Sequence, residues 1–117
     1  PPANSCNACD PAIPDTLYVT LSGLAGDFAS YNGTHQVDWV SGCIWQDGTG
    51  EVQLEYNAGS WYVTVQPAAN CWKNWLGSAS GCAPTDSYSE AGCSDSNCSD
   101  GDSCEDSAGA SCSVSES

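Results

Sequence analysis

Residues 51–66 read EVQLEYNAGSWYVTVQ, and this stretch decides the fold class. Apolar and polar side chains alternate strictly over EVQLEY (51–56) and alternate again over SWYVTVQ (60–66). Such alternation is typical of strands that bury one face and expose the other. Between them, Asn57-Ala58-Gly59 offers a glycine for a left-handed turn position. The stretch therefore predicts a β-hairpin whose apolar face carries Val52, Leu54 and Tyr56 on the first strand, with Trp61, Val63 and Val65 pointing inward from the second.

The flanking sequence extends the strand pattern in both directions. Four further stretches carry it: TLYVTLS (16–22), THQVDWV (34–40), CIWQ (43–46) and ASCSVS (110–115), the last of which would place Cys112 inward. Residues 70–76 (NCWKNWL) fit either one turn of helix or a short strand. Short strands separated by Gly-containing turns predict an all-β domain, specifically a disulfide-stapled β-sandwich or jelly-roll-like fold.

The composition divides the chain into three parts. A Pro-rich N-terminal arm (1–15) carries Cys6 and Cys9 and precedes a single domain (16–117). Within that domain, residues 77–109 are rich in Ser, Cys and acidic side chains and poor in large apolar ones. We expect this segment to form a stapled loop, with a possible final strand at 110–115. A sandwich of this kind has exposed strand edges, which can pair with another chain.

The charge balance excludes two classes of partner. The sequence has one Lys or Arg side chain, Lys73, against 15 Asp and Glu, and its formal net charge is -14. Nucleic acids and anionic membranes attract basic proteins, so we predict no nucleic-acid partner. No run of 18 apolar residues occurs, which predicts no membrane insertion.

Cysteine usage predicts the compartment. Nine cysteines in a short chain without a second Cys-x-x-Cys pair favour disulfides over zinc, and disulfides favour an extracellular location. The first residue is Pro1, which we interpret as the start of a mature secreted chain. An odd number leaves at least one cysteine free or bonded to another chain, and the pairing stays open. The cysteines are Cys6, Cys9, Cys43, Cys71, Cys82, Cys93, Cys98, Cys104 and Cys112.

The stretch IPDTLYVTLSGLAGDFASYNGTHQVDW (13–39) carries a resemblance. It is entered by a Cys-containing arm and followed by strands with Cys and Trp. It resembles small Cys-rich secreted β-sandwich domains of environmental bacteria and phage structural proteins, over residues 6 to 66. The chain is also similar in style to subunits of extracellular fibres. The resemblance implies an extracellular or virion structural role; the acidic tail departs from it.

No catalytic constellation stands out. His35 is the only imidazole, at the start of an expected strand, and no serine lies in a G-x-S-x-G context. The many carboxylates leave a glycosidase-like pair open, but a chain of 117 residues offers little wall for a deep cleft. We predict that the protein is not an enzyme and that His35 is an ordinary strand-edge residue.

The acidic segment could bind calcium, which prefers several oxygen ligands. No cofactor is required by the sequence. EF-hand spacing fails, because counting from Asp95 places the required glycine at Asp100. The alternative interpretation is a solvated acidic loop. The candidate ligands are Asp95, Asp100, Asp102, Glu105 and Asp106.

Two N-glycosylation sequons occur, at Asn32-Gly33-Thr34 and Asn97-Cys98-Ser99. Each lies in an expected loop, where a glycan acceptor must be exposed. Asn32 and Asn97 are therefore candidate glycosylation sites.

Aromatic residues could bind sugar rings. Five Trp and five Tyr are present. We assign Trp39, Trp61, Trp72 and Trp75 to the core, because they provide most of the bulk that this chain can bury. Trp45 and Tyr62 are the candidates for outward, ligand-stacking positions.

The favoured function is a structural subunit of an extracellular assembly, such as a filament, an appendage or a virion decoration. Copies of the chain would associate through strand edges and the N-terminal arm and be locked by disulfides. The net charge opposes this association unless calcium, salt or glycans intervene. The alternative is a secreted carbohydrate-binding, lectin-like module, with glycans as partners.

Overall fold

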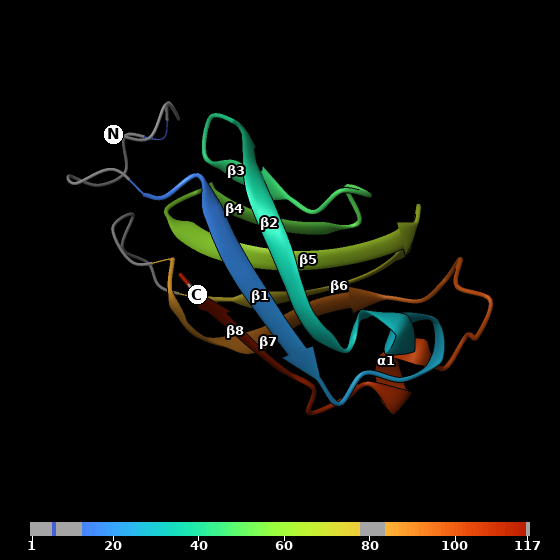
Figure 1. Ribbon diagram of the computed structural model, residues 1–117. Helices are drawn as coiled ribbons and strands as arrows, with labels where there is room; N and C mark the ends of the chain where they lie inside the picture. Colours follow the sequence, from blue (N-terminus) through green and yellow to red (C-terminus); the bar gives the residue numbers. More distant parts are fainter. Residues whose placement is uncertain (1–5, 7–12, 78–83, 117) are drawn as a thin grey trace.

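The computed structural model describes residue 6, residues 13–77 and residues 84–116 (Figure 1). Most of these residues lie in antiparallel strands. In chain order the strands are β1 (Thr16–Ser22), β2 (Gly33–Ser41), β3 (Ile44–Gln46), β4 (Val52–Asn57), β5 (Ser60–Ala68), β6 (Cys71–Leu76), β7 (Asp86–Ser94) and β8 (Ser111–Ser115). Two short helices accompany them: the 3₁₀ helix η1 (Gly26–Tyr31) and α1 (Ser103–Asp106).

The sheet closes into a barrel in which each strand pairs with its neighbours in the chain. Closure is completed where β8 returns beside β1, with Val19 opposite Val114. The predicted all-β class is confirmed, but the predicted sandwich or jelly roll is wrong. Alternation cannot distinguish the two architectures, since both place every second side chain inward.

Closure removes the strand edges expected from a sandwich. β1 is paired on one side with β2 and on the other with β8. A closed barrel has no row of unpaired backbone groups for another chain to join. Among the described strands, the edges through which self-association was predicted are therefore absent.

The hairpin predicted from residues 51–66 is formed by β4 and β5, with Asn57 opposite Ser60. Ala58 and Gly59 both have positive φ, at 52° and 86°, which is the geometry of a type I′ turn. The ambiguous residues 70–76 form a strand, β6. The expected loop at 77–109 contains strand β7, whose buried apolar position is Tyr88, so that prediction was wrong for residues 86–94.

The barrel interior is filled by side chains, as expected for eight strands. Trp45, Trp61 and Trp75 are completely buried, and the Trp45 and Trp61 ring centroids lie 5.7 Å apart. The predicted outward position of Trp45 is therefore wrong. Its indole nitrogen donates to the Pro14 carbonyl at 3.0 Å, so its polar group is satisfied inside.

Between the described cysteines, three disulfides fasten segments to the barrel. Cys6–Cys43 ties the arm to the β2–β3 turn. Cys71–Cys98 and Cys93–Cys104 tie the segment after β7 to β6 and to β7 itself. Cys9 and Cys82 lie outside the described residues. Three disulfides fit an extracellular or otherwise oxidising environment.

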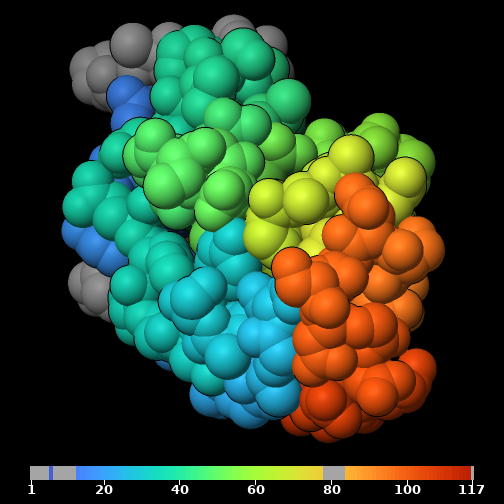
Figure 2. Space-filling model, turned by 90° about the vertical axis from the view of Figure 1, so that its right-hand side faces the viewer, coloured from blue at the N-terminus to red at the C-terminus, as the bar shows by residue number. Residues whose placement is uncertain are grey.

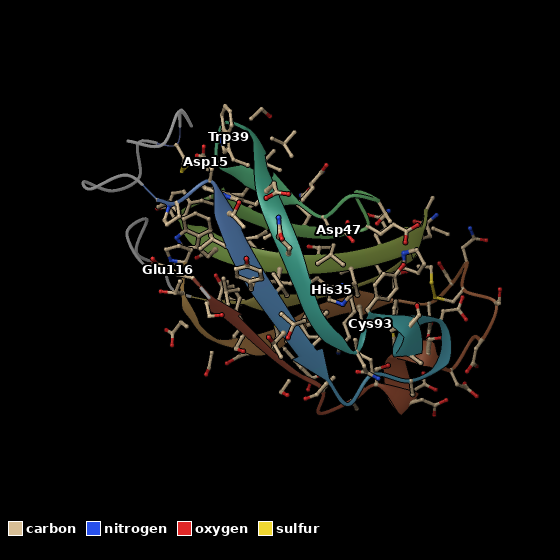
Figure 3. The ribbon with its side chains drawn as sticks, in the orientation of Figure 1. Asp15, His35, Trp39, Asp47, Cys93 and Glu116 are labelled. Atoms are coloured by element: carbon tan, nitrogen blue, oxygen red, sulfur yellow. A yellow bond between two sulfur atoms is a disulfide. The ribbon has the colours of Figure 1, made fainter. Side chains whose placement is uncertain are left out.

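The two ends of the barrel differ. Figure 3 shows Asp15 and Trp39 at the end where the arm enters, and Cys93 toward the opposite end. At that opposite end, η1 lies side by side with the segment that follows β7 (Figure 2). The Asp27 carboxylate of η1 joins them, accepting the backbone N–H groups of Ser99 at 2.7 Å and Asp100 at 2.9 Å.

Candidate functional site

An open hollow of about 360 Å³ lies on the outer face of β5 and β6. β5, the β5–β6 turn and β6 supply all of its lining side chains. These are Thr64 and Gln66 from β5, Ala69 and Asn70 from the turn, and Trp72 and Asn74 from β6. None of these side chains is charged, although the protein as a whole carries a net charge of -14.

Trp72 forms the aromatic wall of the hollow. Its neighbours Cys71 and Lys73 point inward, so the strand geometry directs Trp72 outward and leaves it half-buried. The indole lies across Gly92 of β7: a Cβ at Gly92 would approach two indole ring carbons to 3.1 Å. Glycine at 92 thus makes room for the ring. The prediction that Trp72 belongs to the core was wrong.

Two polar residues of the hollow, Asn74 and Asn70, are held in place by hydrogen bonds to neighbouring segments. The Asn74 Oδ1 accepts the Gly92 N–H at 2.6 Å, which turns its NH₂ group away from that bond. Asn70 adopts a positive φ of 60°, and its carbonyl accepts the Asn97 N–H at 3.0 Å. The adjacent Cys71–Cys98 disulfide reinforces this contact. The hollow is therefore held at both β7 and the segment after it.

Several polar side-chain groups of the hollow have no hydrogen-bond partner in the described part of the chain. Within the described part of the chain, no hydrogen bond engages the Thr64 hydroxyl, the Gln66 side-chain amide or the Trp72 indole N–H. Amides and hydroxyls can both donate to and accept from a ligand's hydroxyl groups. The indole offers an apolar face beside them. This combination suits a ligand that is uncharged, rich in hydroxyls and apolar on one face.

Tyr62, a predicted stacking residue, lies on the same outer face. It is half-buried on β5, two residues before Thr64 and opposite Leu76 of β6. The structure thus brings one of the two predicted stacking residues to this face. Trp72 was missed because its spacing from Trp75 reads as one face of a helix, whereas on a strand the two rings fall on opposite faces.

The predicted calcium ligands do not converge. Asp95 accepts the Cys104 N–H at 3.1 Å, and Asp100 accepts the Asp102 N–H at 3.0 Å. The pKa of Glu105 is raised, first by its hydrogen bond to Asp102 and then by neighbouring negative charges, including that of Asp106.

Among the described residues, one group of three metal-ligating side chains comes within 4.8 Å: Asp27, Cys71 and Cys98. Its two sulfur atoms are joined in a disulfide, so the group offers no thiolate to a metal. Calcium binding by the acidic segment stays a prediction.

Both predicted glycosylation sites use their side chains to hold the backbone. Asn32 Nδ2 donates to the Leu24 carbonyl at 3.0 Å, and its Oδ1 accepts the Leu24 N–H. Asn97 Nδ2 donates to the Ala69 carbonyl at 2.9 Å. A glycan at either nitrogen would compete with these bonds. Their modification stays a prediction.

Two further reactive groups in the described residues, the His35 imidazole and the Cys112 thiol, are engaged or shielded. His35 Nε2 lies 2.6 Å from the Tyr31 carbonyl, an arrangement in which the imidazole donates. Cys112, the free cysteine among the described residues, points into the barrel at 4% exposure. Burial raises the pKa of its thiol to about 12, which keeps it protonated and unreactive.

No protein family, curated protein or solved structure matches this chain. In the described residues, no helix is both long and apolar enough to span a membrane.

Proposed function

We propose that the protein is an extracellular carbohydrate-binding domain that holds an uncharged sugar in the hollow beside Trp72. The observation that carries this proposal is a half-buried indole beside uncharged polar side chains. In the described part of the chain, the Thr64 hydroxyl and the Gln66 amide have no hydrogen-bond partner. A pyranose ring presents C–H groups on one face and hydroxyls around its rim. The indole can pack against the first while Thr64, Gln66 and Asn74 bond to the second.

The charge distribution favours an uncharged sugar. The single basic side chain, Lys73, lies inside the barrel at 4% exposure and is paired with Glu90. An acidic polysaccharide would approach a protein of net charge -14 with no cation on this face to receive it. Neutral glycans avoid this repulsion.

Self-assembly, the function first expected from the sequence, has less support. The closed barrel removes the edge-pairing route within the described strands. Of the cysteines that could link subunits, Cys6 is bonded to Cys43 of the same chain and Cys112 is buried, while Cys9 and Cys82 lie outside the described residues. These contacts favour a binding domain over a crosslinked subunit.

Affinity electrophoresis tests the proposal. The protein would be run through native gels that contain hydroxyethylcellulose, xylan, mannan or glycol chitin, with alginate as the acidic comparison. We expect retardation by at least one neutral polysaccharide and none by alginate. Trp72→Ala should abolish the retardation because it removes the aromatic wall.

Trp39→Ala is the matched control. Trp39 is also half-buried, but it lies at the arm end of the barrel and donates to the Gly42 carbonyl. This variant should migrate as the wild type does in every gel. If no neutral polysaccharide retards the protein, or if Trp72→Ala is retarded like the wild type, the proposal is wrong.

A further inference from the structure

β5 and β6 continue from the residues that line the hollow toward the arm end of the barrel, as the course of the two strands in Figure 1 shows. β5 presents Tyr62, Thr64 and Gln66 outward, and β6 presents Leu76, Asn74 and Trp72. The register places Thr64 opposite Asn74 and Tyr62 opposite Leu76. The surface is therefore a polar centre with an aromatic ring toward each end.

The two rings are too far apart for one sugar. Trp72 and Leu76 are four residues apart on β6, and Leu76 is the partner of Tyr62. A strand rises about 3.3 Å per residue, so the strand positions that carry the two rings lie roughly 13 Å apart along the strands. This separation exceeds the length of a single pyranose ring. A ligand that touches both rings must be an extended chain of sugars.

Between the rings, the surface offers hydrogen bonds to such a chain. The Thr64 hydroxyl and the Asn74 NH₂ group lie on paired residues, so they flank the middle of the path. Within the described residues, neither group has another partner. Leu76, at 39% exposure, adds an apolar contact beside Tyr62.

The neighbouring strand sets the charge at the Tyr62 end. Glu55 of β4 lies opposite Tyr62, and its carboxylate accepts the Gln53 amide at 3.2 Å. The Gln53 side-chain carbonyl in turn accepts a hydrogen bond from the Gln46 amide at 2.7 Å. The Glu55 carboxylate is therefore held in place by a chain of side-chain hydrogen bonds. A carboxylate next to the second ring repels uronic acids and leaves neutral sugars unaffected.

We propose that the site binds an extended, uncharged polysaccharide chain that runs along β5 and β6, with one sugar on Trp72 and another on Tyr62. This inference rests on the proposed function and specifies its ligand class. It predicts that affinity increases with chain length, and that Tyr62 contributes only to ligands long enough to reach it.

Calorimetric titration with two length series tests the inference. The probes are cellobiose and cellohexaose, and chitobiose and chitohexaose. In at least one series we expect the hexasaccharide to bind about tenfold more tightly than the disaccharide, since one added aromatic contact is of this order. Tyr62→Ala should bring the hexasaccharide down to the affinity of the disaccharide, and Trp72→Ala should abolish binding of both.

Tyr18→Ala is the matched control for Tyr62→Ala. Tyr18 is half-buried on the outer face of β1, which is four strands away on the closed barrel. It should leave the hexasaccharide affinity unchanged. Circular dichroism of each variant would verify that the barrel is intact.

The outcomes separate the two proposals. If disaccharide and hexasaccharide bind equally, or if Tyr62→Ala binds the hexasaccharide like the wild type, the extended-chain inference is wrong. Binding that still depends on Trp72 would then leave the proposed function standing. If neither series binds and the electrophoresis also shows no retardation, both proposals are wrong.

Discussion

The ammonium group of Lys73 lies 2.5 Å from the Glu90 carboxylate and places the single basic side chain of the sequence inside the barrel. The ammonium also lies 5.3 Å from the centroid of the Trp75 ring. The second oxygen of Glu90 accepts the Gly109 N–H at 2.8 Å. The pair thus connects β6 and β7 to the turn before β8, where the barrel closes.

We expect Glu90→Gln to destabilise the protein at pH 7 and to lose this effect in acid. The Lys73 hydrogen bond lowers the pKa of Glu90 below its ordinary value of 4.5. The carboxylate therefore stabilises the fold above about pH 4.5, and this contribution disappears as the pH falls through the lower folded pKa. Because Glu90 is 36% exposed, we expect a loss of about 1 kcal/mol. Urea unfolding between pH 3 and pH 7 would measure it.

Glu116→Gln is the control for this experiment, because Glu116 is exposed near the C-terminus. It should follow the wild-type curve at each pH. A stability difference between Glu90→Gln and wild type that is as large at pH 3 as at pH 7 would contradict the assignment.

The Cys112 thiol should resist alkylation in the folded protein. Its burial and its pKa of about 12 leave almost no thiolate at pH 8. Iodoacetamide should add to Cys112 only after denaturant unfolds the barrel, and peptide mass spectrometry would locate the label. Rapid labelling of Cys112 under native conditions would contradict its inward position and reopen its use as a link between chains.

The sequence predicted the strands well because alternation is a local property. The EVQLEY and SWYVTVQ segments need only their own residues to define an inner and an outer face. Closure of the barrel depends instead on the pairing of Val19 with Val114, which are far apart in the chain. No local pattern encodes that contact.

The orientation of the tryptophans was less predictable, for physical reasons that differ between sites. Ile44 and Trp45 are both apolar, so the alternation in β3 does not define which one points inward. In β6 the inward position is taken by Lys73, which hydrophobicity alone would place outside. Its pairing with Glu90 makes burial tolerable and turns Trp72 outward, toward the hollow.

Ala58→Asn should stabilise the β4–β5 hairpin. Ala58 adopts a φ of 52°, a left-handed conformation that costs alanine free energy and that asparagine tolerates better. We expect a gain of about 0.5 kcal/mol in the free energy of unfolding, measured by urea denaturation. Ala69→Asn, in the β5–β6 turn but without a positive φ, is the comparison and should show no such gain. An unchanged or lower stability of Ala58→Asn would refute the turn assignment.

The two disulfides that hold the segment after β7, Cys71–Cys98 and Cys93–Cys104, should have separable roles. Replacing Cys93 and Cys104 together by alanine removes the shorter crosslink, and we expect it to cost about 2–3 kcal/mol of stability. Replacing Cys71 and Cys98 together should also weaken polysaccharide binding, because that bond holds the turn beside Trp72. Chemical denaturation and the affinity gels would measure both effects. Equal binding by the two double variants would show that Cys71–Cys98 does not position the hollow.

Calcium and magnesium should stabilise the protein equally at matched ionic strength. Calcium selectivity requires several oxygens on one ion, but no three of the five candidate carboxylates, all of them described, bring their oxygens within 4.8 Å of one another. The pKa of Glu105 is raised first by its hydrogen bond to Asp102 and then by neighbouring negative charges, and any cation can screen those charges. Thermal unfolding in calcium chloride, magnesium chloride and EDTA would test this. An unfolding midpoint that is clearly higher in calcium than in magnesium would instead establish a specific site. Asp102→Asn would then locate that site, because it keeps the backbone N–H bonds of Asp95 and Asp100 and should lower the midpoint only in calcium.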